Sequence, residues 1–481
     1  MIIATAGHVD HGKTKLIEAI TGVNSDRLPE EKNRGMSIDL GFAYHDLGNG
    51  VILNFIDVPG HERFINNLLS GFSNVDLGLL VIAADDGPMP QTEEHLSILQ
   101  LLQVKNCIIV LTKIDKVNQK RLDYVCCLIK KMMHKTIFSD AEIFHISNKT
   151  SQGIDNLVSH LKIIALNYHH KEVKGNFRLS VDRRFLVKGA GIVITGTVVS
   201  GEVSVGEELI HSKSGESLKI RAIHSQSKKS KNGIQGHRCS LNITGQKITI
   251  DKISRGDWIL SKNVFFVTNR LDAVLSILKN EKKIFKHWTA IHLYLGSGNV
   301  TGRIAILGSF SINPGEKKIV QLVLDKPVHA VFDDKFVIRD ISSSRTIGGG
   351  YILDPFAKKN NNTNFRSFRS ERLKLISPNS SKIVLNNLLL HYIEGIGLKY
   401  FLMSRNLTAS EFEKIIEPLD IVTELYKKHK WLILKTNWIC LQKIILDKLL
   451  KKDQPLSGQG MELNTILKAI KLNPIEILRH E

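Results

Sequence analysis

Eight consecutive residues near the amino terminus have the spacing of a phosphate-binding loop. They are Gly7-His8-Val9-Asp10-His11-Gly12-Lys13-Thr14, which read G-x4-G-K-T between an expected strand, Ile2–Ala6, and an apolar helical stretch, residues 16–20. Glycines let backbone N–H groups close around a β-phosphate. We expect Lys13 to reach the β- and γ-phosphates and the Thr14 hydroxyl to bind Mg²⁺. The alternative, a chance glycine-rich turn, is disfavoured by the strand–loop–helix setting.

A second motif predicts which base the nucleotide carries. Thr112-Lys113-Ile114-Asp115 follows an expected strand at residues 107–111 and has the [NT]KxD pattern. The Asp115 carboxylate can accept hydrogen bonds from guanine N1–H and N2–H₂, donors that adenine lacks in that arrangement, while the Lys113 stem covers the ring. This pattern favours GTP over ATP. Thr112 replaces a commoner Asn, and Ser147-Asn148-Lys149 stands where a weaker guanine-site motif is expected.

Asp57-Val58-Pro59-Gly60 has the pattern of a loop that senses the γ-phosphate. It ends an expected strand at residues 51–56. We expect Asp57 to hold Mg²⁺ through water and the Gly60 N–H to contact the γ-phosphate. Loss of that phosphate would then free the loop.

Residues 34–39, Arg-Gly-Met-Ser-Ile-Asp, resemble the other nucleotide-sensing switch. A Thr usually offers Mg²⁺ its hydroxyl there, and Ser37 keeps that hydroxyl while losing only a methyl group. Val9 and Met36 match an apolar pair that keeps water from the γ-phosphate, although either could simply pack. The sequence therefore predicts three Mg²⁺ residues: Thr14, Ser37 and Asp57.

Composition agrees with a large protein that has a polyanionic partner. The chain has 481 residues, with 66 Lys and Arg against 47 Asp and Glu, a net charge of +19 and a pI near 9.5. Charge alone does not separate tRNA from a membrane surface. We find no run of about 18 apolar residues and no signal-peptide pattern, so we expect a cytoplasmic protein without membrane contact. The five cysteines have no CxxC spacing and are expected to be reduced.

The elements that position these motifs suggest several domains. Strand and helix patterns alternate through residues 1–170, which predicts an α/β domain with a parallel sheet. Glycine-broken β patterns follow, and they fit two antiparallel β-barrels, at residues 175–263 and 264–356. Residues 357–370 are polar and rich in Asn, the composition of a linker.

The last part of the chain has the order of a winged helix, which we place at residues 371–437. A short helix is expected at residues 398–405, and Thr408 with Glu411 forms a capping box for another. Two short strands then flank the basic tip Lys427-Lys428-His429-Lys430. A second module is expected at residues 438–481, with helices through residue 451, at residues 461–470 and from Asn473-Pro474. No strands remain for its wing.

Beyond these motifs, long stretches of the first 355 residues are similar to the bacterial selenocysteine-specific elongation factors, a family of translational GTPases. They include MIIATAGHVDHGKT, ITGVNSDRLPEEKNRGMSIDLGFAY, DVPGHERFINNLLSG and FVIRDISSSRTIGGGYILDP. The RLPEEKNRGMSIDLG wording is specific, and the likeness to elongation factor Tu is weaker. The resemblance implies a P-loop GTPase domain, two β-barrels and carboxy-terminal winged helices, with GTP and Mg²⁺ as ligands.

The resemblance also implies residue roles. His61, directly after DVPG, would orient the attacking water when the ribosome moves it inward; a structural histidine is the alternative. Asp182, Arg183 and Arg238 would line an aminoacyl pocket on the first barrel. Selenocysteine is largely anionic at neutral pH and its seryl precursor is neutral, so two guanidiniums would favour selenocysteyl-tRNA. A purely structural Asp182–Arg238 ion pair is the alternative.

The family normally ends in four winged helices, the last of which grips an mRNA hairpin beside a UGA codon. This chain has about one and a half, so hairpin binding is the least supported expectation. The expected protein is a monomeric carrier of selenocysteyl-tRNA to the ribosome. The alternatives are a general aminoacyl- or initiator-tRNA carrier, or an RNA-binding relic without delivery.

Overall fold

The computed structural model describes residues 1–450, with short gaps at residues 27, 35–36, 49–50, 62–63, 73–74, 168–171, 227, 358, 360–368, 370–371, 378–379, 394 and 427–428. The chain divides into two compact units. The first comprises residues 1–330 and 334–352, and the second comprises residues 331–333 and those from 353 onward. Met36, Lys427, Lys428 and the helices expected at residues 461–470 and from Asn473 lie outside the described residues, as does most of the expected linker.

The first unit opens with a sheet of six strands in the order β2-β3-β1-β4-β5-β6. The neighbouring strands run parallel except for β2, which is antiparallel to β3. β1 and β4 are buried along their whole length, which explains why they are continuous apolar runs. The strands are β1 (Ile2–Ala6), β2 (Gly41–Asp46), β3 (Ile52–Asp57), β4 (Leu77–Ala83), β5 (Asn106–Thr112) and β6 (Ile143–His145).

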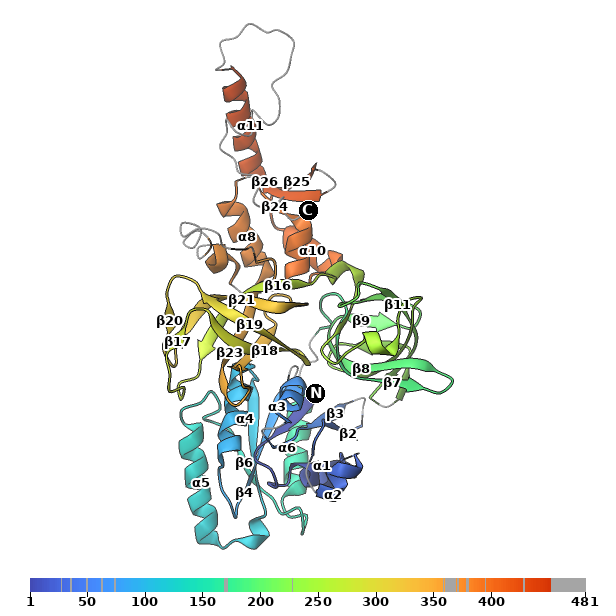
Figure 1. The fold of residues 1–481 in the computed structure, drawn as a ribbon, viewed down its shortest axis with the longest axis vertical. Coiled ribbons are helices and arrows are strands. Elements are labelled where there is room, and N and C mark those ends of the chain that lie inside the picture. Colours follow the sequence, from blue (N-terminus) through green and yellow to red (C-terminus); the bar gives the residue numbers. More distant parts are fainter. Residues whose placement is uncertain are drawn as a thin grey trace. The chain divides into compact units, whose positions relative to one another are not determined.

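Helices cover both faces of this sheet (Figure 1). Apolar residues of α1 (Lys13–Thr21) and α6 (Ile154–Asn167) share one buried cluster, and those of α3 (Ile65–Gly71), α4 (Pro90–Leu101) and α5 (Gln119–Met133) share another. A short helix, α2 (Pro29–Arg34), precedes β2. The carboxyl ends of β1, β3, β4 and β5 therefore lie at one edge, where such sheets bind ligands.

The next part of the unit is a six-stranded antiparallel barrel. Its strands follow the order β10-β15-β7-β8-β14-β11, and pairing of β10 with β11 closes the ring. Alternate residues of β14 point inward, so Cys239 packs in the core. The strands are β7 (Arg178–Val187), β8 (Gly191–Ser200), β10 (Glu208–His211), β11 (Ser217–Ser225), β14 (Arg238–Thr244) and β15 (Trp258–Leu260).

A second closed barrel follows, with the strand order β16-β21-β19-β18-β22-β23. It has its own apolar core. The fold predicted for this part of the chain, an α/β GTPase-type domain followed by two antiparallel barrels, is confirmed. The strands are β16 (Thr268–Ile277), β18 (Thr289–Leu295), β19 (Gly298–Ile306), β21 (Lys317–Val328), β22 (Lys335–Asp340) and β23 (Thr346–Asp354).

The second unit has the element order that a winged helix requires: helix, strand, two helices, then two strands. Thr408 and Glu411 form the expected capping box at the start of α10. The predicted boundary after residue 437 falls inside α11, because that helix starts directly where β26 ends, and we propose a boundary at Lys435 instead. The elements are α8 (Ser381–His391), β24 (Ile396–Gly397), α9 (Leu398–Ser404), α10 (Ala409–Ile416), β25 (Ile421–Tyr426), β26 (His429–Leu434) and α11 (Lys435–Leu450).

Two chain-wide expectations can be compared with this structure. Within the described residues, none of the helices is long and apolar enough to cross a membrane. All five cysteines carry free thiols, as expected, and Cys107 and Cys239 are buried. Burial raises the pKa of the Cys107 thiol to about 12 and that of Cys239 to about 11, which keeps both thiols protonated.

Candidate functional site

The predicted phosphate loop connects β1 to α1 and depends on glycine at its start. Gly7 has φ 129° and lies so close to β4 that an added Cβ would come within 2.1 Å of the Val81 carbonyl oxygen. Gly12, also with positive φ, precedes the first residue of α1. The backbone N–H groups of the first turn of α1 have no partners within the helix, so this end of the loop favours an anion.

Lys13 is buried with its ammonium group inside the loop. Its Nζ donates to the carbonyl oxygens of His8 at 2.7 Å and Gly7 at 3.1 Å. Burial lowers the pKa of Lys13 to about 8, although Asp57 and Asp10 oppose that shift. A phosphate beside this ammonium would restore the charged form, which is the role that the sequence predicts for Lys13.

The first half of the loop is held by α4, which sequence reasoning did not assign to the site. The Val9 N–H donates to Gln91 Oε1 at 3.2 Å, and the Gly7 N–H donates to His95 Nδ1 at 2.9 Å. His95 is fully buried, and burial holds its pKa well below the usual range, so the ring is neutral and can accept this bond. Asp10, with φ 60°, is exposed.

The three predicted Mg²⁺ residues meet in one hydrogen-bond network. The Thr14 hydroxyl donates to Asp57 Oδ2 at 2.6 Å and lies 3.0 Å from Ser37 Oγ, which donates to Asp26 Oδ1 at 2.8 Å. Hydroxyl and carboxylate oxygens are the donors that Mg²⁺ prefers, so the residues present fit this ion. Burial raises the pKa of Asp26, a residue that sequence reasoning missed because it has no motif of its own.

Asp57 is oriented by two further hydroxyl groups. Thr5 Oγ1 donates to Oδ1 at 3.1 Å and Ser25 Oγ donates to Oδ2 at 2.6 Å. The side chain is only 1% exposed, so these bonds replace the water that an open carboxylate would have. Asp57 therefore has one fixed direction, toward Thr14.

Gly60 lies directly against the phosphate loop. A Cβ at this position would come within 2.6 Å of Lys13 Nζ and 2.7 Å of the Val9 backbone nitrogen. Only glycine allows this approach without displacing the loop. His61 follows, and its ring lies 6.1 Å from the ring of Phe64. The segment from Asp57 to His61 thus borders the site predicted for the γ-phosphate.

The predicted guanine-site residues meet at the other end of the loop. Asp115 Oδ1 accepts a hydrogen bond from Ser147 Oγ at 2.6 Å, and this bond lowers the pKa of Asp115. The side-chain amide of Asn148 donates to the Gly12 carbonyl at 3.4 Å. Lys149 is exposed at the rim. The loop after β6 therefore lies beside Asp115 and Gly12, and its role in binding guanine stays a prediction.

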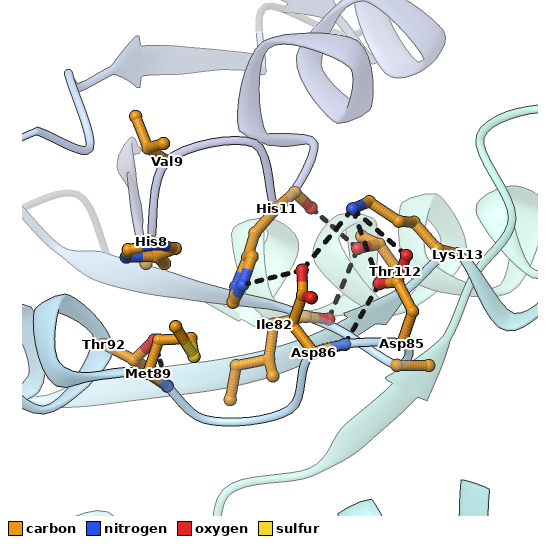
Figure 2. A network of polar contacts seen from close by, with 12 residues as sticks. His8, Val9, His11, Ile82, Asp85, Asp86, Met89, Thr92, Thr112 and Lys113 are labelled. Atoms are coloured by element: carbon orange, nitrogen blue, oxygen red, sulfur yellow. Dashed lines mark hydrogen bonds and ion pairs between the residues drawn. The ribbon is translucent and has the colours of Figure 1, made fainter. Parts of the chain in front are cut away.

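Lys113 is held by an acidic pair that follows β4. Its Nζ lies 3.4 Å from Asp85 and 3.8 Å from Asp86. Figure 2 shows these contacts, with the ring of His11 next to Asp86. Arg121 of α5 donates to the Asp85 carbonyl at 2.7 Å and fixes the same turn. Position could have identified this pair, because Asp85 and Asp86 lie at the carboxyl end of a buried parallel strand.

Of the three residues predicted for the aminoacyl pocket, Asp182 and Arg238 contact each other, whereas Arg183 does not join them. Arg238 forms a bidentate pair with Asp182, with Nε and Nη2 each 2.9 Å from a carboxylate oxygen, and its guanidinium stacks 3.7 Å from the ring centre of Phe42. Burial opposes ionisation of Asp182, but Arg238 and Thr195 outweigh it and lower the pKa of this carboxyl.

Arg183 faces the first domain instead. Its Nη2 lies 2.8 Å from Asp39 and donates to the Leu40 carbonyl at 2.6 Å. Successive residues of a strand point to opposite faces, and the register between β7 and β8 shifts between Val181 and Arg183. The Asp182–Arg238 geometry is compatible with both a pocket and a structural pair, so the role of this trio stays a prediction.

Comparisons with known proteins agree with this architecture. Residues 1–166 match the elongation factor Tu GTP-binding domain, and residues 272–359 match the β-barrel domain of selenocysteine-specific elongation factors. The chain is 41% identical to the selenocysteine-specific elongation factor of Escherichia coli K12 over 353 residues, which are 73% of this chain and 55% of that protein. It is 30% identical to the factor of Methanocaldococcus jannaschii over 65% of this chain and 68% of that protein.

Solved structures of selenocysteine-specific elongation factors are also similar to this chain. A crystal structure of a bacterial selenocysteine-specific elongation factor matches with a TM-score of 0.78 and 29% identity, over 99% of this chain and 76% of that one. The elongation factor SelB of Methanococcus maripaludis in complex with the GTP analogue GppNHp matches with a TM-score of 0.63 and 27% identity, over 74% and 79%. The chain spans about half the length, 55%, of the curated Escherichia coli relative.

Proposed function

Because the chain belongs to the selenocysteine-specific elongation factors, we propose that it binds GTP with Mg²⁺, carries selenocysteyl-tRNA to the ribosome and releases it when GTP is hydrolysed. One observation carries this proposal: the base motif and both switches meet at the same phosphate loop. Thr112 contacts His11, Asp57 and Ser37 contact Thr14, and Gly60 lies so close to Lys13 that an added Cβ would clash with its Nζ. The chain thus has a guanine end and a γ-phosphate end in one site.

The residues around the phosphates have separate roles in the proposed hydrolysis. Lys13 and the backbone N–H groups of the loop bind and orient the phosphates, and Asp115 selects guanine. His61 positions the attacking water once the ribosome moves its ring toward the loop. Mg²⁺, when bound by Thr14, Ser37 and Asp57, would neutralise charge on the β- and γ-phosphates. The chemistry is mostly positioning, so the free protein hydrolyses GTP slowly.

The first barrel supplies the proposed cargo pocket. A selenolate carries a charge that a seryl hydroxyl lacks, and a site built from Asp182, Arg183 and Arg238 can read that difference. Arg238 is only 14% exposed and already has a carboxylate partner, so an added anion would be held in a partly desolvated environment. Electrostatic attraction is stronger there than in water.

The proposal is tested with the full purified chain. We expect it to bind GTP and GDP but not ATP, and to retain selenocysteyl-tRNA over seryl-tRNA when GTP is present. Ribosomes should accelerate hydrolysis, and His61→Ala should reduce that acceleration by about 10²-fold or more while GTP affinity stays near wild type. Equal affinity for ATP, or equal retention of the two tRNAs, would contradict the proposal.

Arg238→Met tests the pocket itself. It should reduce the preference for selenocysteyl-tRNA by about 10- to 100-fold, as expected for the loss of one partly buried charge contact. Because this change leaves Asp182 buried without its partner, Asp182→Asn with Arg238→Met serves as a charge-balanced control. An unchanged preference in both variants would favour a structural ion pair and a general aminoacyl-tRNA carrier.

We extend the proposal to delivery at UGA codons that an mRNA hairpin marks, by a monomer acting in the cytoplasm. The winged-helix order of α8, β24, α9, α10, β25 and β26 supports this extension. Filter binding of a hairpin RNA to this chain, compared with a longer chain that carries further winged helices, tests it. Binding only by the longer chain would leave this one as a cargo carrier without hairpin coupling, and sedimentation would test the monomer.

A further inference from the structure

The second barrel exposes two large aromatic rings, Trp288 and Phe310, which both contact His287. Trp288 is 46% exposed and Phe310 is 75% exposed. The His287 ring stacks on the Trp288 ring with 6.1 Å between their centres, and it meets the Phe310 ring edge-on at 6.2 Å. A single exposed apolar side chain needs no explanation, but a cluster of exposed rings marks a surface that binds a partner.

The three rings are presented on a fixed backbone. They stand at the ends of two short strands that pair with each other, β17 (Phe285–Lys286) and β20 (Ser311–Ile312) (Figure 1). The His287 N–H donates to the Phe310 carbonyl at 2.8 Å, and the Ile306 N–H donates to His287 Nδ1 at 3.1 Å. Little conformational entropy is therefore lost when a partner contacts these rings.

Trp288 has a backbone conformation that costs free energy. Its φ is 66°, in the left-handed region that bulky residues rarely occupy. Two hydrogen bonds hold it there: the Trp288 N–H donates to the Ile304 carbonyl at 2.7 Å, and Arg303 Nη1 donates to the Trp288 carbonyl at 3.3 Å. Glycine or asparagine would fit this turn at a lower cost. Strained backbone of this kind is concentrated at binding sites, and here it places a large ring at the surface.

Basic side chains lie next to the rings. Residues 279–288 contain one carboxylate, Glu281, whose side chain is only 4% exposed and pairs with Arg345, so its charge is already balanced. Arg303 is exposed as well. Lys and Arg bind phosphates, whereas Lys is depleted in contacts between proteins, so these charges favour a nucleic acid over a protein. The lysines of this segment are all exposed: Lys279, Lys282, Lys283 and Lys286.

We propose that Trp288, His287 and Phe310 form a platform on which unpaired bases of an RNA stack, while Lys286 and the neighbouring lysines bind the phosphates. Every base has an aromatic face, so such a platform recognises the single-stranded state rather than a sequence. A duplex buries these faces in its own stack, so it can reach the lysines but not the rings. The platform goes beyond the proposed function, because the nucleotide site and the cargo pocket belong to the first domain and the first barrel.

Competition binding to the full chain tests the platform. The probe is a fluorescent oligoadenylate of about ten nucleotides, within the site size of surfaces that bind single strands. An unlabelled RNA duplex of the same length is present in excess and occupies the sites that recognise only phosphates. Trp288→Gly removes the ring and suits the positive φ, and Phe310→Ser removes a ring that is mostly exposed. Tyr124→Ala is the matched control, because Tyr124 is an aromatic residue of α5 that is 56% exposed.

Each platform variant should bind the oligoadenylate about 5- to 150-fold less tightly, the range for one stack of a base on an aromatic ring. The double variant should no longer prefer the single strand to the duplex. The salt dependence of binding should stay as in the wild type, because no phosphate contact is lost, whereas Lys286→Gln should make it less steep. Tyr124→Ala should change neither quantity.

Wild-type affinity in a double variant that melts at the wild-type temperature would overturn the platform, and so would a wild-type chain that prefers the duplex. If the double variant keeps its affinity for RNA but loses an association between copies of the chain, measured by sedimentation, the rings form a protein contact instead. None of these outcomes alters GTP binding or the choice between selenocysteyl-tRNA and seryl-tRNA, so a failure of the platform is distinguishable from a failure of the proposed function.

Discussion

The hydroxyl group of Thr112 donates a hydrogen bond to the His11 carbonyl oxygen at 2.7 Å, joining the guanine motif to the phosphate loop (Figure 2). Its second contact, the Ile82 carbonyl, lies 3.3 Å away. An Asn is commoner at this position, and the shorter Thr hydroxyl reaches the same loop because both partners are carbonyl oxygens close to β5. The substitution therefore retains a tether between the two ends of the nucleotide site.

Thr112→Val should weaken binding of both GTP and GDP. The change keeps the shape of the side chain but leaves the buried His11 carbonyl without its donor, at a cost of about 1–3 kcal/mol, or roughly 5- to 150-fold in affinity. Isothermal titration calorimetry measures the effect. Thr112→Ser keeps the hydroxyl and should lose much less affinity. Near wild-type affinity in Thr112→Val, or a larger loss in Ser than in Val, would contradict the tether.

His11 should make the first unit sensitive to acid. Burial lowers its pKa from 6.5 to about 4, so between these values the unfolded chain binds a proton that the folded chain does not. Stability should therefore fall as the pH falls from about 6.5 to 4, by about 3 kcal/mol from this residue alone.

Denaturant unfolding between pH 4 and pH 7 tests this expectation. In His11→Asn, the free energy of unfolding should fall less steeply as the pH is lowered. Part of the fall should remain, because burial also holds the pKa of His95 and His329 well below the usual range. His224→Asn, at an exposed position, is the control and should keep the wild-type slope. The same pH dependence of the free energy of unfolding in His11→Asn and in the wild type would show that His11 does not cause the loss of stability in acid.

Glu94 should stabilise the contact between the first domain and the second barrel. Its Oε1 lies 2.5 Å from Nη1 of Arg339, which is fully buried, and accepts a further bond from Thr346 at 2.9 Å. Glu94→Gln leaves the buried guanidinium without a carboxylate, which should cost about 3 kcal/mol and lower the melting temperature of the first transition by several degrees.

Adding Arg339→Met to Glu94→Gln provides the comparison. Since the uncompensated charge is then gone, part of the lost stability should return. Differential scanning calorimetry of the three chains gives the result. A double variant that is less stable than Glu94→Gln by the full cost of a second mutation would indicate that the two side chains act independently.

The sequence could predict those parts of the fold that depend on local pattern. β1 was predicted at its observed bounds, because a strand buried on both faces is a continuous apolar run. β2 was not predicted, because its second half is only partly buried and it lacks such a run. The Thr408–Glu411 capping box was recognised because its two residues are neighbours on one turn.

The residues of the candidate site also fall into two groups, those that the sequence could predict and those that it could not. Residues of contiguous motifs, such as Thr14 and Asp115, could be named from spacing, and the structure brings their motifs together. Gln91 and His95 could not, because each reaches the site through a contact between elements distant in the chain. Asp26 could not, because it belongs to no motif. The contact of Arg183 with Asp39 could not be predicted either. It depends on the register shift in β7 and on the packing of the first domain against the first barrel.

Ser37 provides a test of the switch that distinguishes the GTP state from the GDP state. Its Oγ lies between Thr14 and Asp26, and a Thr in its place would add a methyl group that restricts rotation about χ1. Because the hydroxyl would then spend more time directed at the metal position, Ser37→Thr should lower the Mg²⁺ concentration needed for half-maximal GTP binding. Ser37→Ala removes the oxygen donor and should raise that concentration, by about 10-fold for one lost ligand.

Titration of Mg²⁺ against a fluorescent GTP analogue and the matching GDP analogue separates a switch from a general metal ligand. If Ser37 acts only in the GTP-bound switch, both changes should alter the titration with GTP and leave that with GDP nearly unchanged. Equal effects on the two nucleotides would mean that Ser37 holds the metal ion in both states.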